Sequence, residues 1–230
     1  ILETKSEIIQ CLTSADVAIL NHEDVTFPKQ KTSAQVVTFG LSGSDVSAKN
    51  VLLNEQAQAQ YDLEYLGKTS QVKLKIVGAH QVSNSLAAAA AFLKKGIDIE
   101  LVAQTLSNSI AKSKWRMQIE VSKKNVTVIN DAYNANPESM KSAIRTLKQI
   151  GVGKNTYAIL GEMLELGELS LPKHQEVAEL IQKLEIQNTI IIGSGAKSIY
   201  DFLSNNGYKG KLHFVENVEK GISKANEMIQ

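Results

Sequence analysis

The spacing of hydrophobic residues changes at about the middle of the chain. In the first half, short and often alternating apolar runs predict strands at 16–20, 36–39, 46–53, 61–65 and 72–77. A helix is expected over residues 3–12 and another, rich in alanine, over 84–95. A third helix begins at Asp98 or Ile99 and ends at Leu106. This half therefore predicts a small mixed sheet, largely antiparallel, with helices.

From residue 125 onward, single apolar strands alternate with amphipathic helices. Strands are expected at 125–130, 156–160, 189–193 and 212–215, and helices at 137–150, 173–186, 196–205 and 218–229. Such alternation is typical of βαβ units, which form a parallel sheet covered by helices on both faces. The polar stretch 110–114 separates the two patterns. We therefore expect an α/β protein of two domains, residues 1–112 and 113–230.

Composition narrows the class of protein. The chain has 230 residues, a net charge of +1 and one cysteine, Cys11. This charge gives no electrostatic reason to expect a nucleic acid or a membrane as partner. No apolar run approaches the ~20 residues of a membrane span, and one cysteine excludes an internal disulfide and fits a reducing compartment. We expect a cytoplasmic, monomeric protein, cut from a longer chain because it starts with Ile1.

The stretch from Ile129 to Met140, INDAYNANPESM, is the richest in candidate functional groups. Asn136 suits the N-cap of the following helix, Pro137 suits its first position and Gly151 suits its end. The loop thus lies at the carboxyl end of a strand in a predicted parallel sheet. Ligands bind at such ends in α/β proteins.

Two other segments carry side chains suited to a nucleotide. Gln81 and Asn84 precede a helix, and their amides offer the donor and acceptor that an adenine edge requires. The alternative is that Ser83 or Asn84 simply caps this helix. Arg116 is always charged and can bind phosphate through two hydrogen bonds, although an isolated arginine is more often a surface residue.

The loop from Gly161 to Glu168 also follows a predicted strand. Its three glutamates have the look of a metal cluster, but residue types alone favour a structured loop with solvated carboxylates. His174 either orients this loop or lies on a solvated helix face. Gly193-Ser194-Gly195 resembles half of a dinucleotide-binding loop, but Ser198 stands where its last glycine is required. A dehydrogenase is therefore disfavoured.

Five segments, in order, resemble the Mur ligase family of peptidoglycan synthesis. They are Thr4–Ile8, Gly78–Ala88, Trp115–Met117, Ile129–Met140 and Leu160–Glu168. The resemblance implies part of a central ATPase domain over 1–112 and a Rossmann-like C-terminal domain, with a mainly parallel sheet, over 113–230. The phosphate-binding Gly-x-x-x-x-Gly-Lys-Ser/Thr loop of such an ATPase is absent from the sequence. We therefore expect only the second part of the central domain.

The family implies an activity with ATP and Mg²⁺. The resemblance is to ligases that join D-alanyl-D-alanine to UDP-N-acetylmuramoyl-tripeptide through an acyl phosphate. Two alternatives stay open within enzymes: a sister Mur ligase that adds another amino acid, or a ligase similar to folylpolyglutamate synthase. A different class of protein, a non-catalytic α/β module that binds a ligand, also stays open for the chain by itself.

The resemblance also assigns nucleotide-binding and catalytic residues. Asn84 matches an asparagine that faces adenine, and Gln81 stands where a second asparagine is usual, one methylene longer. Arg116 matches an arginine that reaches the ATP phosphates when the domains close. Asp131 is expected to face the nucleotide ribose or the incoming amine. Arg116 and Asp131 are the candidate catalytic pair.

Substrate and metal residues follow from the same resemblance. Tyr133, Asn134 and Asn136 are expected to face the peptide substrates, although Asn136 has a sufficient structural role as N-cap. Lys5 lies in Lys5-Ser6-Glu7-Ile8, which resembles a family segment whose lysine is carbamylated and holds a second Mg²⁺. From the sequence pattern alone, Lys5 is an exposed helix lysine.

Overall fold

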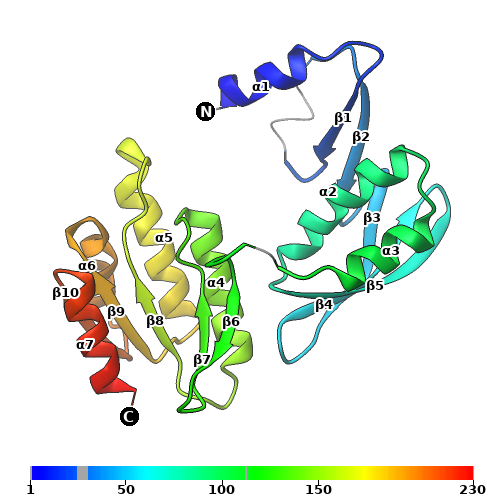
Figure 1. The fold of residues 1–230 in the computed structure, drawn as a ribbon. Coiled ribbons are helices and arrows are strands. Elements are labelled where there is room, and N and C mark those ends of the chain that lie inside the picture. The colour runs from blue at the N-terminus through cyan, green and yellow to red at the C-terminus, as the bar shows by residue number, and fades with distance from the viewer. Residues whose placement is uncertain (1, 25–30, 112, 230) are drawn as a thin grey trace. The chain divides into compact units, whose positions relative to one another are not determined.

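The chain folds into two compact units, Ile1–Ala111 and Lys112–Gln230. The computed structural model describes residues 2–24, 31–111 and 113–229, except for the side chains of residues 2–5. Figure 1 colours the chain from its first residue to its last, so that the first unit runs from blue to green and the second from green to red.

A five-stranded sheet forms the first unit, with its strands side by side in chain order. They are β1 (Val17–Asn21), β2 (Gln35–Gly40), β3 (Val46–Leu53), β4 (Gln58–Tyr65) and β5 (Lys68–Val77). The expectation of a largely antiparallel sheet is wrong for half of the pairings, because β1–β2 and β2–β3 are parallel. β3 pairs only with the last two residues of β2 and then runs on in the same direction. The mixed sheet is confirmed.

Two helices, α2 (Gln81–Lys94) and α3 (Ile99–Asn108), pack on this sheet. Their apolar faces bury Leu86 and Val102 in one core with Leu63 of β4 and Val72 of β5. α1 (Leu2–Gln10) packs separately, through Ile9, against β1. The core of this unit thus lies between the sheet and α2 with α3, and it fixes the start of α2 just beyond the end of β5.

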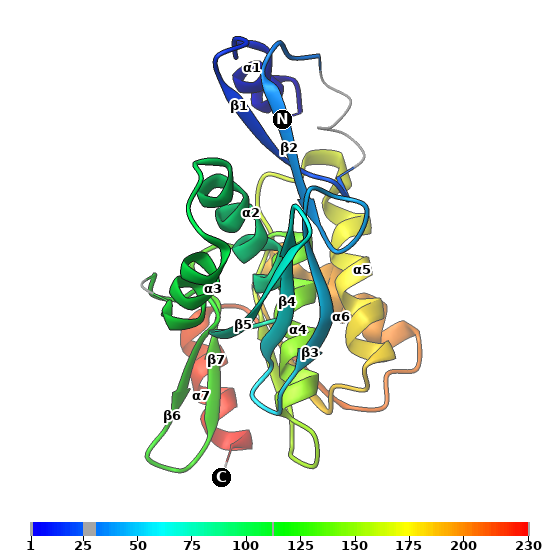
Figure 2. The same cartoon turned by 90° about the vertical axis from the view of Figure 1, so that its right-hand side faces the viewer.

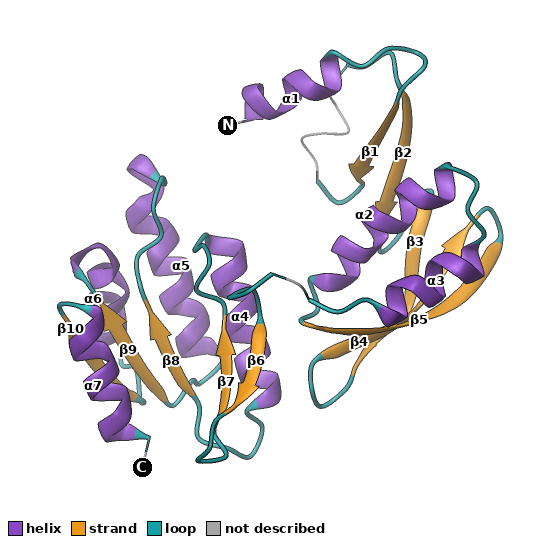
Figure 3. Cartoon of the chain, in the orientation of Figure 1, coloured by secondary structure: helices purple, strands orange, loops and turns teal. Residues whose placement is uncertain are grey.

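The second unit contains a parallel sheet of three strands in the order β10-β9-β8. They are β8 (Tyr157–Leu160), β9 (Asn188–Ile192) and β10 (Lys211–Val215). The helices α4 (Pro137–Ile150), α5 (Ser170–Lys183) and α6 (Lys197–Asn205) share one core with these strands, through residues such as Ile191. α7 (Val218–Met228) packs on the other face, where Gly221 meets Ile192. Figure 3 shows this layering.

A hairpin that the sequence pattern did not predict precedes this sheet. β6 (Gln118–Val121) pairs antiparallel with β7 (Thr127–Asn130), and the two form a separate two-stranded sheet. Figure 2 shows this hairpin. The expectation that 125–130 belongs to the parallel sheet is therefore wrong, because the hydrogen bonds of β7 go to β6. Two short 3₁₀ turns, η2 (Gly167–Leu169) and η3 (Ser194–Ala196), follow β8 and β9.

Helix boundaries differ from the expected ones where capping signals are weak. α4 covers 137–150 as expected, but α5 begins at Ser170 instead of residue 173. Proline is tolerated in the first turn of a helix, so Pro172 lies inside α5 and does not mark its start. Among the described residues, no helix is long and apolar enough to cross a membrane.

Candidate functional site

Local hydrogen bonds hold the loop between β7 and α4 in shape. Asn136 caps α4 by accepting the Ser139 N–H at 2.9 Å, and the Ser139 hydroxyl accepts the Asn136 N–H at 3.1 Å. This is a reciprocal capping box, and it confirms the N-cap expected for Asn136. Asn134 turns its side-chain oxygen to the Ala135 N–H at 2.9 Å. The loop is therefore built by its own amide side chains.

The segment that carries Arg116 is bound to this loop on both sides of the arginine. The Tyr133 N–H donates to the Trp115 carbonyl at 3.0 Å, and the Met117 N–H donates to Oδ1 of Asp131 at 2.8 Å. Both contacts extend the β6–β7 pairing in register, since Gln118 is opposite Asn130. At this position the Asp131 carboxylate accepts the Met117 N–H, where a regular strand pair would use a backbone carbonyl.

The backbone around Arg116 is unusual. Trp115 has a φ of 60° and Met117 a φ of 48°, a left-handed conformation that costs free energy in residues other than glycine. Met117 is buried, while Arg116 is exposed. The Arg116 guanidinium carbon lies 4.3 Å from the centre of the Tyr133 ring, within the range of a cation–π contact. Arg116 thus lies between two left-handed residues, one of them the buried Met117, and its guanidinium contacts the Tyr133 ring.

These contacts bring three candidate residues together, Arg116, Asp131 and Tyr133. Asp131 accepts a backbone N–H, that of Met117 just before β6, and its role towards the ribose or the incoming amine stays a prediction. Asn134 and Asn136 lie on the same loop, but the bonds described above direct their side-chain oxygens to the backbone. Their roles towards a substrate stay predictions.

Charged side chains join the start of α4 to α5. Lys141 lies 2.6 Å from Glu138 and 3.2 Å from Glu176, measured from Nζ to carboxylate oxygen. The hydrogen bond to Glu138, followed by that to Glu176, raises the pKa of Lys141. Lys173, followed by Lys141, lowers the pKa of Glu176. This network holds α4 against α5 next to the loop that carries the candidate residues.

In the first unit, Gln81 and Asn84 bond to each other in the first turn of α2. Nδ2 of Asn84 donates to Oε1 of Gln81 at 3.1 Å, and Nε2 of Gln81 lies 3.0 Å from Nε2 of His80. Capping by Ser83 or Asn84 is wrong, because α2 begins at Gln81 and His80 occupies the N-cap. His80 folds over Gly78, whose φ of 109° and lack of a Cβ make room for the ring. The turn presents the two amides as one unit.

The loop after β8 is anchored by His174. This histidine is completely buried, so the alternative of a solvated helix face is wrong. Its Nε2 accepts the Met163 N–H at 3.0 Å and its Nδ1 donates to the Ser170 carbonyl at 2.7 Å, which together describe one neutral tautomer. Glu162 lies across Gly195, where a Cβ would overlap its carboxylate. No pattern in the sequence predicted the contact between Glu162 and Gly195.

The glutamates of this loop do not form a metal cluster. Glu162, Glu165 and Glu168 are all exposed. Within residues 2–24, 31–111 and 113–229, no group of three histidine, cysteine, aspartate or glutamate side chains is placed to hold a metal ion. Lys5 belongs to α1, but its side chain lies outside the described residues.

We expect His174→Ala to destabilise the second unit by about 2–4 kcal/mol. The substitution opens a cavity and leaves the buried Met163 N–H without its acceptor. Ser170→Ala is the matched control, because it keeps the Ser170 carbonyl that the ring contacts. Urea unfolding of the chain measures both variants. A loss for His174→Ala no greater than that of the control would contradict an anchoring role.

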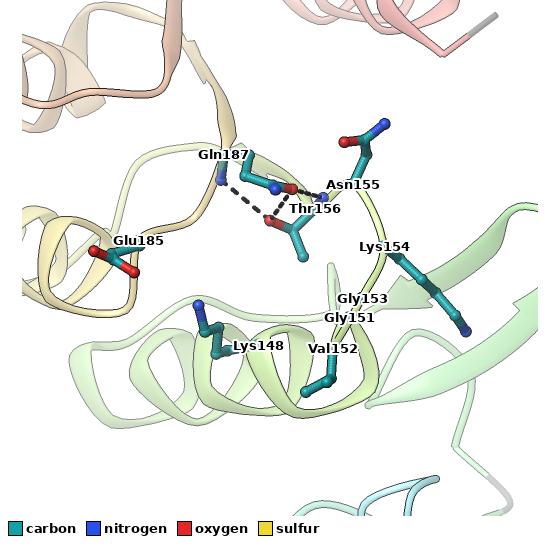
Figure 4. Close-up of a pocket in the computed structure, with 9 residues that line it drawn as sticks. All are labelled: Lys148, Gly151, Val152, Gly153, Lys154, Asn155, Thr156, Glu185 and Gln187. Carbon is teal, nitrogen blue, oxygen red and sulfur yellow. Dashed lines mark hydrogen bonds between the residues drawn. The ribbon is translucent and has the colours of Figure 1, made fainter.

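A cavity of ≈ 380 Å³ lies at the opposite end of β8, where the strand begins (Figure 4). It is lined by Lys148, Gly151, Val152, Gly153, Lys154, Asn155, Thr156, Glu185 and Gln187. The side chains of Thr156 and Gln187 cross-link the starts of β8 and β9, with the Thr156 N–H donating to Oε1 of Gln187 at 2.9 Å. None of the sequence-predicted site residues lines this cavity.

Two family models match the chain. The model described as the Mur ligase middle domain matches residues 1–92, and the model described as the Mur ligase glutamate ligase domain matches residues 115–230. The second match alone covers half of the chain.

Individual relatives carry the name of one ligase. UDP-N-acetylmuramoyl-tripeptide–D-alanyl-D-alanine ligase of Mycobacterium tuberculosis is 35% identical over 202 residues, which are 85% of this chain and 40% of the relative. The structure of UDP-N-acetylmuramoylalanyl-D-glutamyl-2,6-diaminopimelate–D-alanyl-D-alanyl ligase from Acinetobacter baumannii matches all of this chain and 48% of its own, with 27% identity and a TM-score of 0.79. MurF ligase from Thermotoga maritima in complex with ADP matches 99% of this chain and 56% of its own, with 22% identity and a TM-score of 0.70. The chain spans about half the length of these proteins.

Proposed function

We propose, since the chain belongs to the Mur ligase family, that it is part of an ATP-dependent ligase that joins D-alanyl-D-alanine to UDP-N-acetylmuramoyl-tripeptide. The relatives' names support this choice of substrates. The observation that carries the proposal is the meeting of Arg116 with the loop 131–136 at the end of β7. One phosphate-binding cation and several amide and carboxylate groups are thereby gathered at one strand end.

The proposed reaction has two steps. The terminal carboxylate of the tripeptide attacks the γ-phosphate of ATP, which forms an acyl phosphate and releases ADP. The amine of D-alanyl-D-alanine then attacks the acyl carbon, and the tetrahedral intermediate expels phosphate. The first step brings two anions together, so a fixed cation lowers its barrier by neutralising charge that develops on the phosphoryl group. Arg116 is the residue that we assign to this task.

The donors of the chain suit ATP. The joined amides of Gln81 and Asn84 suit an adenine edge, which needs a donor beside an acceptor. The Arg116 guanidinium suits a phosphate, which accepts two parallel hydrogen bonds from it. We assign Asp131 to the ribose or the incoming amine. Asn134 and Asn136 are the candidates for contact with the peptide substrates, whereas Tyr133 lies against Arg116.

Mg²⁺ is proposed as the second cofactor. It would screen the phosphate charges and prefers oxygen ligands. The described residues offer no three-ligand cluster for it, and the ligand that we assign to this chain is the carbamate of Lys5. The other ligands would come from ATP, water and the rest of the enzyme. Expected properties that stay proposals are a cytoplasmic location and a monomeric state.

We expect the 230-residue chain by itself to form no peptide bond. Its sequence contains no Gly-x-x-x-x-Gly-Lys-Ser/Thr loop to hold the ATP phosphates. The test mixes the purified chain with ATP, Mg²⁺ and both substrates and follows the ligated product by mass spectrometry, with a full-length enzyme as positive control. Product formed by the chain alone would contradict the expectation.

The proposed function is tested in the full-length protein. Release of ADP and phosphate should require UDP-N-acetylmuramoyl-tripeptide and D-alanyl-D-alanine together. Single amino acids in place of the dipeptide test for a sister ligase, and a folate with glutamate tests for an enzyme similar to folylpolyglutamate synthase. Turnover with one of these, and none with the dipeptide, would overturn the proposed substrates.

A further inference from the structure

We propose that Tyr133 is a positioning residue whose ring holds the Arg116 guanidinium ready for a phosphate, and that its contribution to turnover passes through Arg116. This inference rests on the proposed function and deepens it. It assigns to Tyr133 a role different from direct contact with the peptide substrate. The carrying observation is the distance of 4.3 Å between the guanidinium carbon and the ring centre.

The hairpin brings the two residues to the same place. Its register, continued beyond Gln118 and Asn130, puts Met117 opposite Asp131 and Trp115 opposite Tyr133. A hydrogen bond joins each pair: the Met117 N–H donates to the Asp131 carboxylate at 2.8 Å, and the Tyr133 N–H donates to the Trp115 carbonyl at 3.0 Å. Arg116 lies between them, so its backbone is fixed on either side relative to the backbone of Tyr133. From this fixed backbone the Arg116 side chain reaches the face of the Tyr133 ring.

The contact leaves the arginine able to bind an anion. Stacking on a ring uses the flat face of the guanidinium, whereas its N–H donors point outward in the plane of the group. A carboxylate partner would instead occupy those donors and neutralise the charge. Among the described residues, the structure forms no ion pair with Arg116, although seven lysine–carboxylate pairs occur elsewhere. The tyrosine ring thus orders the cation while its charge and its hydrogen-bond donors stay available.

An Arg116 side chain that is already ordered before ATP binds has a catalytic benefit. A long arginine side chain loses rotamer freedom when it binds a phosphate, and this loss weakens the interaction. A ring that already restrains the side chain removes part of that loss before ATP binds. The two left-handed residues, Trp115 and Met117, fit the same purpose, because strained backbone of this kind persists where the surrounding contacts enforce it.

The first test measures the geometry in the 230-residue chain. The side-chain protons of Arg116 should resonate upfield of their usual positions, because the guanidinium carbon lies over the Tyr133 ring. Tyr133→Phe should keep this shift and Tyr133→Leu should abolish it. Phe92→Leu is the control, since Phe92 is an equally exposed aromatic residue of the other unit. An unshifted Arg116 proton in the unmodified chain would overturn the proposal without reference to activity.

The second test is a double-mutant cycle in the full-length ligase. Tyr133→Phe keeps the ring, so its kcat should stay well above that of Tyr133→Leu. Tyr133→Leu should lower kcat about three- to tenfold, the scale of a lost cation–π contact, with KM for D-alanyl-D-alanine unchanged. In an Arg116→Ala background, the same Tyr133→Leu change should have almost no further effect.

Three results would overturn the proposal. A raised KM for D-alanyl-D-alanine in Tyr133→Phe would assign the phenol to the substrate. Additive losses in the cycle would separate Tyr133 from Arg116. Full activity of Tyr133→Leu, beside a strong loss in Arg116→Ala, would reject the positioning role and keep the proposed function. If Arg116→Ala itself is fully active, the role of Arg116 fails and the positioning role of Tyr133 fails with it, whereas the proposed ligase function is decided by the separate test of its substrates.

Discussion

Arg116→Ala in the full-length enzyme is expected to lower kcat by roughly a hundredfold or more. This is the scale observed when one preorganised partner of transition-state charge is removed. Arg116→Lys should also be impaired, because an ammonium keeps the charge but cannot make two parallel hydrogen bonds or stack its plane on Tyr133. Steady-state release of phosphate, with saturating substrates, measures the effect.

The matched control for this prediction is Arg145→Ala. Arg145 is an exposed arginine of α4 in the same unit, so its removal changes the net charge equally. Unchanged kinetics in Arg116→Ala would return this residue to the surface arginines. An equal loss in both variants would point to net charge instead of a specific contact.

Lys5→Ala is expected to cost roughly a hundredfold or more in turnover, because a bound metal contributes several kcal/mol to stabilising phosphoryl transfer. An ammonium beside Mg²⁺ and ATP would repel the metal, whereas a carbamate would bind it. Added short-chain carboxylates such as acetate should restore part of the activity by replacing the missing anion.

Lys68→Ala serves as the control, since Lys68 is an exposed lysine of β5 in the same unit. Acetate should have no effect on that variant. Full activity of Lys5→Ala would rule out the metal role. An inactive variant that acetate cannot rescue would leave the carbamate without support, whereas a mass increase of 44 Da on Lys5 in the native enzyme would support it independently.

Capping residues explain why the start of α4 could be predicted. Asn136, Pro137 and Gly151 each favour one end of a helix through the geometry of a single residue, so the sequence contains the boundary. The start of α2 has no comparable signal. His80 caps it without a side-chain hydrogen bond, and the reason for its position lies in the packing of the ring over Gly78. Packing of this kind depends on the final fold.

The geometry around Arg116 could not be predicted because β6 was missed. Met117, Ile119 and Val121 alternate with polar residues, which is the signal of a strand. The signal covers only a few residues, and the turn that links the strands contains Asn125 in a left-handed conformation. Without this pairing, Arg116 and Tyr133 belong to two separate motifs, and nothing in the sequence indicates that they meet. His174 was similarly ambiguous, because its burial follows from the packing of α5.

The register of the β6–β7 hairpin decides which loop residues meet the backbone on either side of Arg116. One residue added or removed between Gln118 and Val121 would shift the register by which Met117 meets Asp131 and Trp115 meets Tyr133, the two contacts that hold the backbone around Arg116. The turn from Ser122 to Val126 lies beyond the paired residues. Extra residues there would lengthen an exposed loop and leave the pairing intact. Length variation among related proteins should therefore be tolerated in this turn and excluded from the strand.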